Sequence, residues 1–195
     1  SSGAVTFKDA PNFESAADAG GDNVYNITVT ASDGTLTNNK AVAITVTDVN
    51  EAPTAVALTG ETNSLAENTS TASHIKVADI AITDDALGTE AVTLTGADAA
   101  SFEVVGGALY LKADTALNFE AKNSYDVTVN VADITVVGST PVTTNYHLDL
   151  TNVNEAPTVT SNATANFAEN ATGAVYTVTA TDPDAGATQT YSISG

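Results

Sequence analysis

The sequence predicts an all-β fold. Three observations support this prediction: an excess of Thr, Val and Ile, several runs in which apolar and polar residues alternate, and an internal repeat. β-Branched side chains fit the pleated surface of a sheet better than the surface of a helix. No stretch of the chain has a convincing helical period, so we expect strands to supply the regular structure.

Alternating segments mark the individual strands. Four of them place an apolar residue at every second position, between Thr, Asn or Asp, which is the pattern of a strand with one solvated face. They are YNITVT at residues 25–30, AVAITV at residues 41–46, YDVTVNV at residues 125–131 and YTVT at residues 176–179. Gly106 and Gly107 separate two further apolar runs, FEVV and ALYL, and predict a two-residue β-hairpin turn.

An internal repeat is the most informative feature of the sequence. DVNEAP at residues 48–53 returns as NVNEAP at residues 152–157, and YNITVTASD at residues 25–33 returns as YDVTVNVAD at residues 125–133. Two shorter matches keep the same order: NFE at residues 12–14 and 118–120, and AEN at residues 66–68 and 168–170. Four matches in one order indicate a duplicated domain with loops of different length.

The repeat predicts where the domains begin and end. Residues 54–157 form one complete repeat, residues 1–53 are the C-terminal half of a preceding repeat, and residues 158–195 are the N-terminal half of a following one. Together the two halves lack only a short segment, equivalent to residues 97–104. A repeat of about 100 residues with roughly seven short strands has the size of an immunoglobulin-like sandwich.

Charge and composition exclude several functions. The 195 residues include 24 acidic side chains and 5 basic ones, all Lys, for a net charge of −19. Such a chain repels nucleic acid, so we expect no nucleic-acid partner. It has no Cys, which excludes disulfides and thiolate metal sites. No apolar run approaches the roughly 20 residues of a membrane span, so we expect no membrane insertion.

Acidic residues gather where the expected strands end and where the repeats join. Calcium takes six to eight oxygen ligands at about 2.3–2.6 Å, and such junctions offer carboxylates and Asn carbonyls with few basic residues nearby. The alternative is that acidic loops only keep the protein soluble. The clustering favours cation binding, because like charges packed at each junction need a counter-ion. The clustered positions are Glu14, Asp33, Asp48, Glu51, Glu67, Asp84, Asp85, Glu120, Asp133, Glu155, Glu169, Asp182 and Asp184.

Several short motifs carry a resemblance to a known family. They are the linkers at residues 48–53 and 152–157, LNFE at residues 117–120, DPD at residues 182–184, ASD at residues 31–33, and the Glu of each AEN match. These motifs resemble those of cadherin repeats, in the form found in very long bacterial surface and secreted proteins of the adhesin type. The resemblance implies tandem immunoglobulin-like Greek-key β-sandwiches in an end-to-end array. It also implies an extracellular location, secreted or attached to the cell surface, and Ca²⁺ bound between repeats.

The same resemblance implies a set of calcium ligands for each junction. For the first junction they are Glu14, Asp48, Asn50, Glu51, Asp85 and Asp133. For the second they are Glu67, Glu120, Asn154, Glu155, Asp182 and Asp184. Asp33 and Glu169 also match ligand positions of the family. The other ligands of those two sites would come from the complementary half of each repeat. Thr83, Asn118 and Asn152 stand where the family pattern has Asp, so we expect fewer ions or weaker sites.

Catalysis is not expected. His74 and His147 are the only histidines, both in strand-like sequence, and no Ser lies in a G-x-S-x-G pattern. A carbohydrate-cleaving cleft would need an aromatic lining, and the chain has no Trp and only 6% aromatic residues.

Two functions therefore remain open. In the first, the repeats are calcium-rigidified structural or adhesive units of a long bacterial surface or matrix protein. In the second, a repeat is a recognition module that binds a cell-surface glycan or protein. The two half-repeats leave a further alternative open. Either they complete each other between identical chains, which would give a head-to-tail filament, or they are a cut from a continuous array whose neighbouring repeats serve as partners.

Overall fold

The chain is all-β, as the sequence predicts. A computed structural model describes residues 3–195, with 39% of the chain in strands and 2% in helix. It divides into two compact units. The first unit contains the described residues up to Ala55 together with Ile82–Ala91 and Val131–Val142, and the second contains Val56–Ala81, Val92–Asn130 and Thr143–Gly195. The repeat boundaries after residues 53 and 157 stay a prediction.

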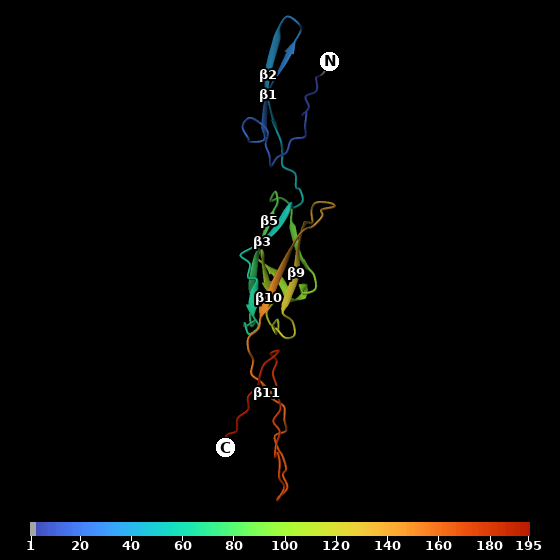
Figure 1. The fold of residues 1–195 in the computed structure, drawn as a ribbon. Coiled ribbons are helices and arrows are strands. Elements are labelled where there is room, and N and C mark those ends of the chain that lie inside the picture. Colours follow the sequence, from blue (N-terminus) through green and yellow to red (C-terminus); the bar gives the residue numbers. More distant parts are fainter. Residues whose placement is uncertain (1–2) are drawn as a thin grey trace. The chain divides into compact units, whose positions relative to one another are not determined.

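A long antiparallel hairpin is the main element of the first unit (Figure 1). Its strands are β1 (Val24–Ser32) and β2 (Thr37–Thr45), paired from Val24 opposite Thr45 to Ser32 opposite Thr37. Asp33 closes the turn, because its Oδ1 accepts the backbone N–H groups of Thr35 and Leu36, each at 2.8 Å. Both strands predicted in this region are therefore present.

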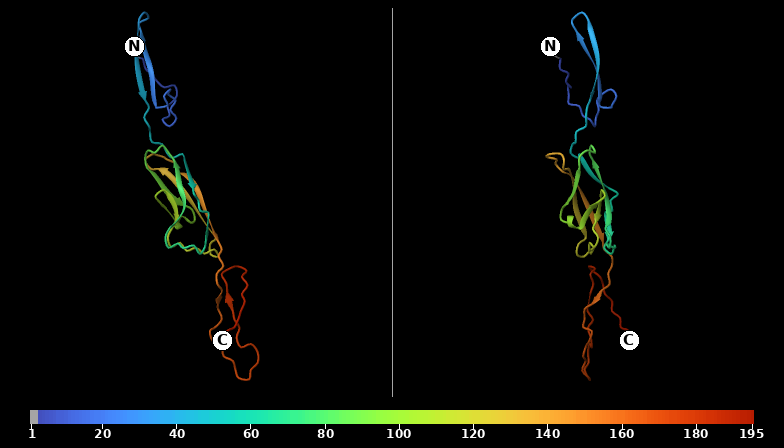
Figure 2. Two further views of the ribbon diagram at one scale, coloured as in Figure 1. Left: turned by 90° about the vertical axis from the view of Figure 1, so that its left-hand side faces the viewer. Right: turned by 180° about the vertical axis from the view of Figure 1, so that it is seen from behind.

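Two four-stranded sheets form a sandwich, with strand orders β4-β10-β9-β6 and β3-β5-β8-β7 (Figures 1 and 2). β4 pairs with β10 in parallel, and β8 pairs antiparallel with both β5 and β7. A short 3-10 helix, Ala99–Ser101, precedes β7. The strands are β3 (Ala55–Thr59), β4 (Ser64–Ala66), β5 (Ile75–Thr83), β6 (Glu90–Thr95), β7 (Phe102–Val105), β8 (Ala108–Leu111), β9 (Ser124–Asp133) and β10 (Val142–Thr151).

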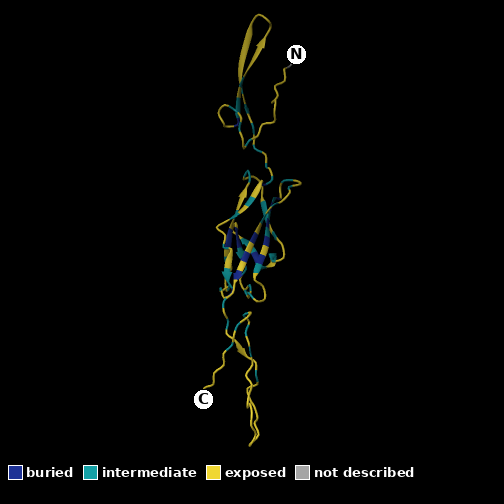
Figure 3. Cartoon of the chain, in the orientation of Figure 1, coloured by how far each residue is buried: buried dark blue, intermediate teal, exposed yellow. Residues whose placement is uncertain are grey.

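Alternating residues of these strands build the core, which is drawn in dark blue in Figure 3. Along β9 every second side chain is buried, beginning with Tyr125 and Val127. Phe102 packs edge to face against Tyr125 and Tyr146, with ring centroids 6.4 Å and 5.8 Å apart. The Tyr146 hydroxyl donates a hydrogen bond to the carbonyl of Thr62, and burial raises the pKa of Tyr146. The predicted alternation is thus confirmed here.

The predicted turn between β7 and β8 is also present. Gly106 and Gly107 have φ of +57° and +79°, a conformation that glycine adopts without strain and that suits a tight hairpin. In residues 3–195, no helix is long and apolar enough to cross a membrane.

The C-terminal segment pairs much less than the sequence predicts. Only β11 (Thr158–Val159) and β12 (Ala180–Thr181) form a ladder, of two residue pairs. The strand predicted at residues 176–179 is wrong, because these residues have no ladder partner among the described strands. An alternating pattern predicts which face of a strand is buried. A strand forms, however, only where a neighbouring strand accepts and donates its backbone hydrogen bonds.

Candidate metal centres

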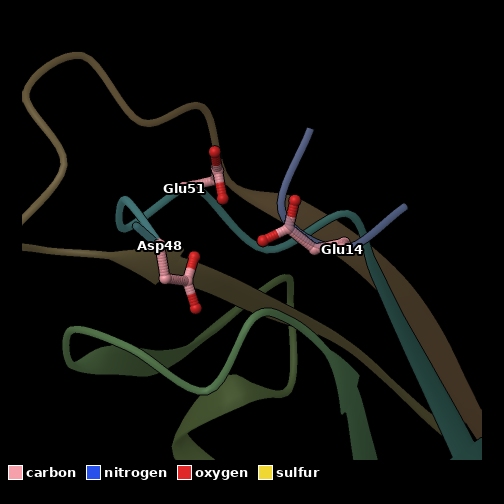
Figure 4. Close-up of side chains that lie close together, drawn as sticks. All are labelled: Glu14, Asp48 and Glu51. Carbon is pink, nitrogen blue, oxygen red and sulfur yellow. The ribbon is translucent and has the colours of Figure 1, made fainter. Parts of the chain in front are cut away.

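Three carboxylates meet in the first unit, as Figure 4 shows. One oxygen each from Glu14, Asp48 and Glu51 lies within 4.8 Å of the other two. Glu14 comes from the loop before β1, and the other two come from the segment after β2. A cavity of about 430 Å³ borders this group, lined in part by Asn12, Glu14, Glu51 and Asp85. Three negative charges thus gather beside a space large enough for ions and water.

Asp85 orients this segment from the loop after β5. Its Oδ2 accepts the backbone N–H of Glu51 at 2.8 Å, and its Oδ1 accepts that of Leu87 at 2.7 Å. These hydrogen bonds lower the pKa of Asp85. The pKa of Glu51 is raised, first by desolvation and then by the charge of Glu14. A cation beside Glu51 would relieve that repulsion.

Asp133 lies at the end of β9 and is 1% exposed. Only one of its two carboxylate oxygens accepts hydrogen bonds. Its Oδ1 accepts both the backbone N–H and the hydroxyl of Thr135, each at 2.6 Å, and the hydroxyl hydrogen bond is the main reason why the pKa of Asp133 falls to about 2. Its Oδ2, like Oδ1 of Asn50, is buried with no hydrogen-bond partner among residues 3–195. A Cβ added at Gly88 would lie 2.1 Å from the first of these oxygens and 2.7 Å from the second. The free carboxylate oxygen of Asp133 and the side-chain amide of Asn50 therefore converge on one spot.

Further buried oxygens of the first unit lack a partner within the described part of the chain. The carboxylate oxygens among them are Oδ1 of Asp48, both oxygens of Asp84, and Oε1 of Glu90. The pKa of Asp84 is raised by burial and then by its contact with Glu90. Buried charged oxygens without donors are costly unless a cation neutralises them. Asp84 is one of the clustered acidic positions of the sequence, whereas Glu90 is not among the positions that the sequence singled out.

A second group of carboxylates lies in the second unit. Oxygens of Glu67, Glu120 and Glu155 lie within 4.8 Å of one another. Glu67, just after β4, is 7% exposed. Its two oxygens accept the backbone N–H groups of Phe119 and Val153, each at 2.7 Å, and these hydrogen bonds lower the pKa of Glu67. Glu67 therefore holds together the loop that carries Glu120 and the segment that carries Glu155.

The second group repeats a contact of the first. Oδ2 of Asp184 accepts the backbone N–H of Glu155 at 2.9 Å, as Asp85 accepts that of Glu51. Asp182 supports Asp184, because its Oδ1 accepts the N–H of Asp184 at 3.0 Å. Asn154 donates from Nδ2 to the carbonyl of Glu155 at 3.0 Å. The pKa of Glu155 is raised by burial and then by its acidic neighbours.

Two of the expected ligands belong to neither group. Asp33 lies in the β1–β2 turn, at the end of the hairpin opposite the Val24–Thr45 pair that leads into Asp48. Glu169 is exposed in the segment between β11 and β12. The sequence assigned both to partners from another half-repeat, and the structure of one chain leaves that assignment a prediction.

The donor atoms of both groups decide which ion they suit. All are carboxylate or amide oxygens, and no His takes part in either group among the residues that the structure describes. Hard divalent cations such as Ca²⁺ prefer such ligands, whereas zinc and copper prefer nitrogen and sulfur.

Known proteins resemble this chain in structure. No protein-family model and no curated protein sequence matches it. The structure described as "Protocadherin gammaB7 EC3-6 cis-dimer" superposes with a TM-score of 0.62 at 26% identity, covering 84% of this chain and 40% of that one. Extracellular cadherin domains 3-6 of protocadherin gamma B2 give 0.63 at 24% identity, covering 92% and 42%. Domains 1-5 of the same protein give 0.61 at 21% identity, covering 88% and 34%.

These similarities define the class of fold. The chain is a cadherin-like β-sandwich protein, as the sequence motifs predict, and its neighbours are extracellular domains. It spans less than half the length of each of these structures.

Proposed function

We propose that this chain is a calcium-rigidified structural module of a long extracellular protein, a bacterial surface or matrix protein of the adhesin type. Its units are the repeats at residues 1–53, 54–157 and 158–195, joined at two calcium-binding junctions. The observation that carries the proposal is the recurrence of one arrangement in both units. In each, three carboxylates meet and an Asp from the next repeat fixes the linker Glu by its backbone N–H.

The electrostatics of the two groups support a role for Ca²⁺. Raised pKa values at Glu51 and Glu155 reflect desolvation and repulsion that a divalent cation would offset. Unpartnered buried oxygens of Asp48, Asn50 and Asp133 supply further ligands in the first unit. With ions bound, each junction links the loops of one repeat to the start of the next, so that segments joined only by a short linker resist bending.

Calcium titration of metal-free protein tests the proposal. We expect isothermal titration to show Ca²⁺ binding in preference to Mg²⁺, because Mg²⁺ demands an octahedral shell and dehydrates reluctantly. We also expect chelation to lower the melting temperature, because an ion that binds only the folded state stabilises it. Small-angle scattering should report a more flexible chain after chelation. Identical scattering profiles with calcium and with chelator would contradict the rigidifying role.

A matched pair of variants locates the sites. Glu120→Gln removes one ligand charge from the second group, whereas Glu61→Gln removes the same charge from an exposed Glu outside both groups. We expect E120Q to weaken calcium binding and to reduce the stabilisation by calcium, and E61Q to leave both unchanged. If the two variants had equal effects, calcium binding would depend only on the net charge of the chain.

A further inference from the structure

The first unit places two carboxylates against each other at the ends of the loop between β5 and β6. Asp84 directly follows β5, and Glu90 is the first residue of β6. Their side chains are in contact, and neither belongs to the carboxylate group that Figure 4 shows. Two carboxylates in contact repel each other unless a proton or a cation lies between them.

No side chain of the described residues offsets this repulsion. Both oxygens of Asp84 and Oε1 of Glu90 are buried, and none of the three has a hydrogen-bond partner among residues 3–195. Within the same residues, no Lys or His forms an ion pair with either carboxylate. Buried carboxylates in proteins are neutralised, paired or bound to a metal ion, because an isolated buried charge is costly. The pair therefore needs a counter-charge from outside the described chain.

Asp133 gives independent evidence that a cation belongs at this loop. Its side chain is 1% exposed, and its Oδ2 has no hydrogen-bond partner in the described part of the chain. This oxygen faces the loop, because it lies 2.1 Å from the place that a Cβ on Gly88 would take. The other oxygen accepts the backbone N–H of Thr89 at 3.4 Å, which ties the end of β9 to the residue before Glu90. A further buried, unpartnered carboxylate oxygen thus lies against the loop that carries the pair.

The internal repeat shows a compensating exchange at these positions. Residues 83–90 align with residues 182–189 without a gap, and the Asp at 85 and the Thr at 89 recur at 184 and 188. Three aligned pairs exchange an acidic residue for a neutral one: Thr83 with Asp182, Asp84 with Pro183, and Glu90 with Gln189. The junction that has Thr in place of the first Asp thus carries two acidic residues that the other junction lacks.

We propose that Asp84 and Glu90 bind a calcium ion at the loop between β5 and β6, where they replace the charge that Thr83 does not supply. This inference rests on the proposed calcium role of the junction and adds two ligands to it. Asp84 also lines the cavity of about 430 Å³ that borders Glu14 and Glu51, so an ion can reach it from solvent. Backbone carbonyls and water complete the shell, because Ca²⁺ takes about six to eight oxygens.

The pair has opposite effects on stability with and without the ion. In metal-free protein the buried repulsion between the two carboxylates opposes folding. With calcium bound, the same oxygens are ligands, and an ion that binds only the folded state stabilises it. Removing one of the two charges should therefore stabilise the metal-free protein and destabilise the calcium-bound protein.

Two isosteric variants test this expectation. Glu90→Gln and Asp84→Asn each remove one charge and keep the size of the side chain. We expect each to raise the melting temperature in chelator, to lower it in saturating calcium, and to bind one calcium ion fewer in isothermal titration. The control is Glu61→Gln, which removes the same charge from an exposed residue outside the loop. E61Q should bind as many ions as the unmodified chain and should show no such reversal.

A rescue variant tests the exchange between the two junctions. Thr83→Asp added to E90Q gives the first junction the Asp and Gln that the second junction has at these positions. We expect T83D/E90Q to bind the calcium ion that E90Q alone loses. If the double variant folds, as judged by circular dichroism, and still lacks that ion, the proposed replacement of Thr83 is wrong.

The outcomes separate this inference from the proposed function. If the unmodified chain binds calcium and E90Q and D84N bind as many ions, the inference is overturned and the other calcium ligands stand. If the unmodified chain binds no calcium, both are overturned. If E90Q raises the melting temperature equally in calcium and in chelator, the pair shares a proton in place of a cation, and the inference is overturned as well.

Discussion

Gly88 offers the sharpest test of the first candidate metal centre. It lies in the loop between β5 and β6 with φ of +78°, and a Cβ there would approach Oδ2 of Asp133 to 2.1 Å and both side-chain oxygen and nitrogen of Asn50 to 2.7 Å. Gly88→Ala therefore pushes directly on two expected calcium ligands without altering any charge. Asp133 cannot move freely, because Thr135 holds its other oxygen through two hydrogen bonds.

The expected loss of stability has two parts. A left-handed conformation costs a non-glycine residue about 1–2 kcal/mol. If the carboxylate of Asp133 turns away, the backbone N–H groups of Thr89 and Thr135 lose their acceptor, and each lost hydrogen bond costs about 0.5–1.5 kcal/mol. We therefore expect G88A to lower the free energy of unfolding by about 2–5 kcal/mol. Its calcium affinity should fall as well, because both ligands are displaced.

Gly138 provides the matched control. Its φ is +82°, and a Cβ there would meet no atom within 4 Å. Gly138→Ala should lower the free energy of unfolding only by the backbone contribution, about 1–2 kcal/mol, and should leave the calcium affinity unchanged. Urea unfolding of metal-free protein followed by circular dichroism measures the first quantity, and isothermal titration measures the second. Equal calcium affinities of G88A and G138A would refute the assignment of Asp133 and Asn50 as ligands.

Two further predictions concern the sandwich and its surface. Val129→Ala should destabilise the protein by about 1–3 kcal/mol in urea unfolding, because Val129 is fully buried, while the repeat-equivalent Val29→Ala should cost much less because Val29 is exposed. His147 contacts Asp126 at 2.7 Å and Asp149 at 3.1 Å, and these contacts raise its pKa. The stabilisation from protonated His147 is thus complete below its unfolded pKa and is lost as pH rises through the folded value. An NMR titration should show Asp126→Asn lowering the His147 midpoint, and an unchanged midpoint would contradict this.

Much of the fold could be predicted because its signals are local or repeated. The alternation in β9 and the Gly106–Gly107 turn each depend on a few neighbouring residues, so the sequence alone identifies them. The repeat then related Glu51 to Glu155, and the family resemblance placed Asp85 and Asp184 in the two ligand sets. The structure gives both pairs the same backbone hydrogen bond, a contact that the repeat did not specify but that is consistent with the duplication.

The remaining features depend on what surrounds a segment. YTVT at residues 176–179 has the alternation of a strand, but a strand forms only beside a partner, and the described chain supplies almost none there. Glu90 was missed as a candidate ligand for a related reason. Glu90 begins β6 and carries no motif, and only the folded loop brings it against Asp84. A carboxylate pair formed across a loop has no sequence spacing that identifies it.

The two groups use their carboxylates for two different tasks, and this division explains why they suit a cation. Asp85 and Asp184 each use one carboxylate oxygen to accept a backbone N–H of a linker. These hydrogen bonds hold the linkers in place without an ion. Glu51 and Glu155, held in place by those hydrogen bonds, point into groups of like charge where their pKa values rise. An ion entering such a group meets ligands that are already oriented, so little conformational entropy remains to be lost when it binds. Under the proposed function, the charge that would drive the junctions apart is thus the charge that a divalent cation would neutralise.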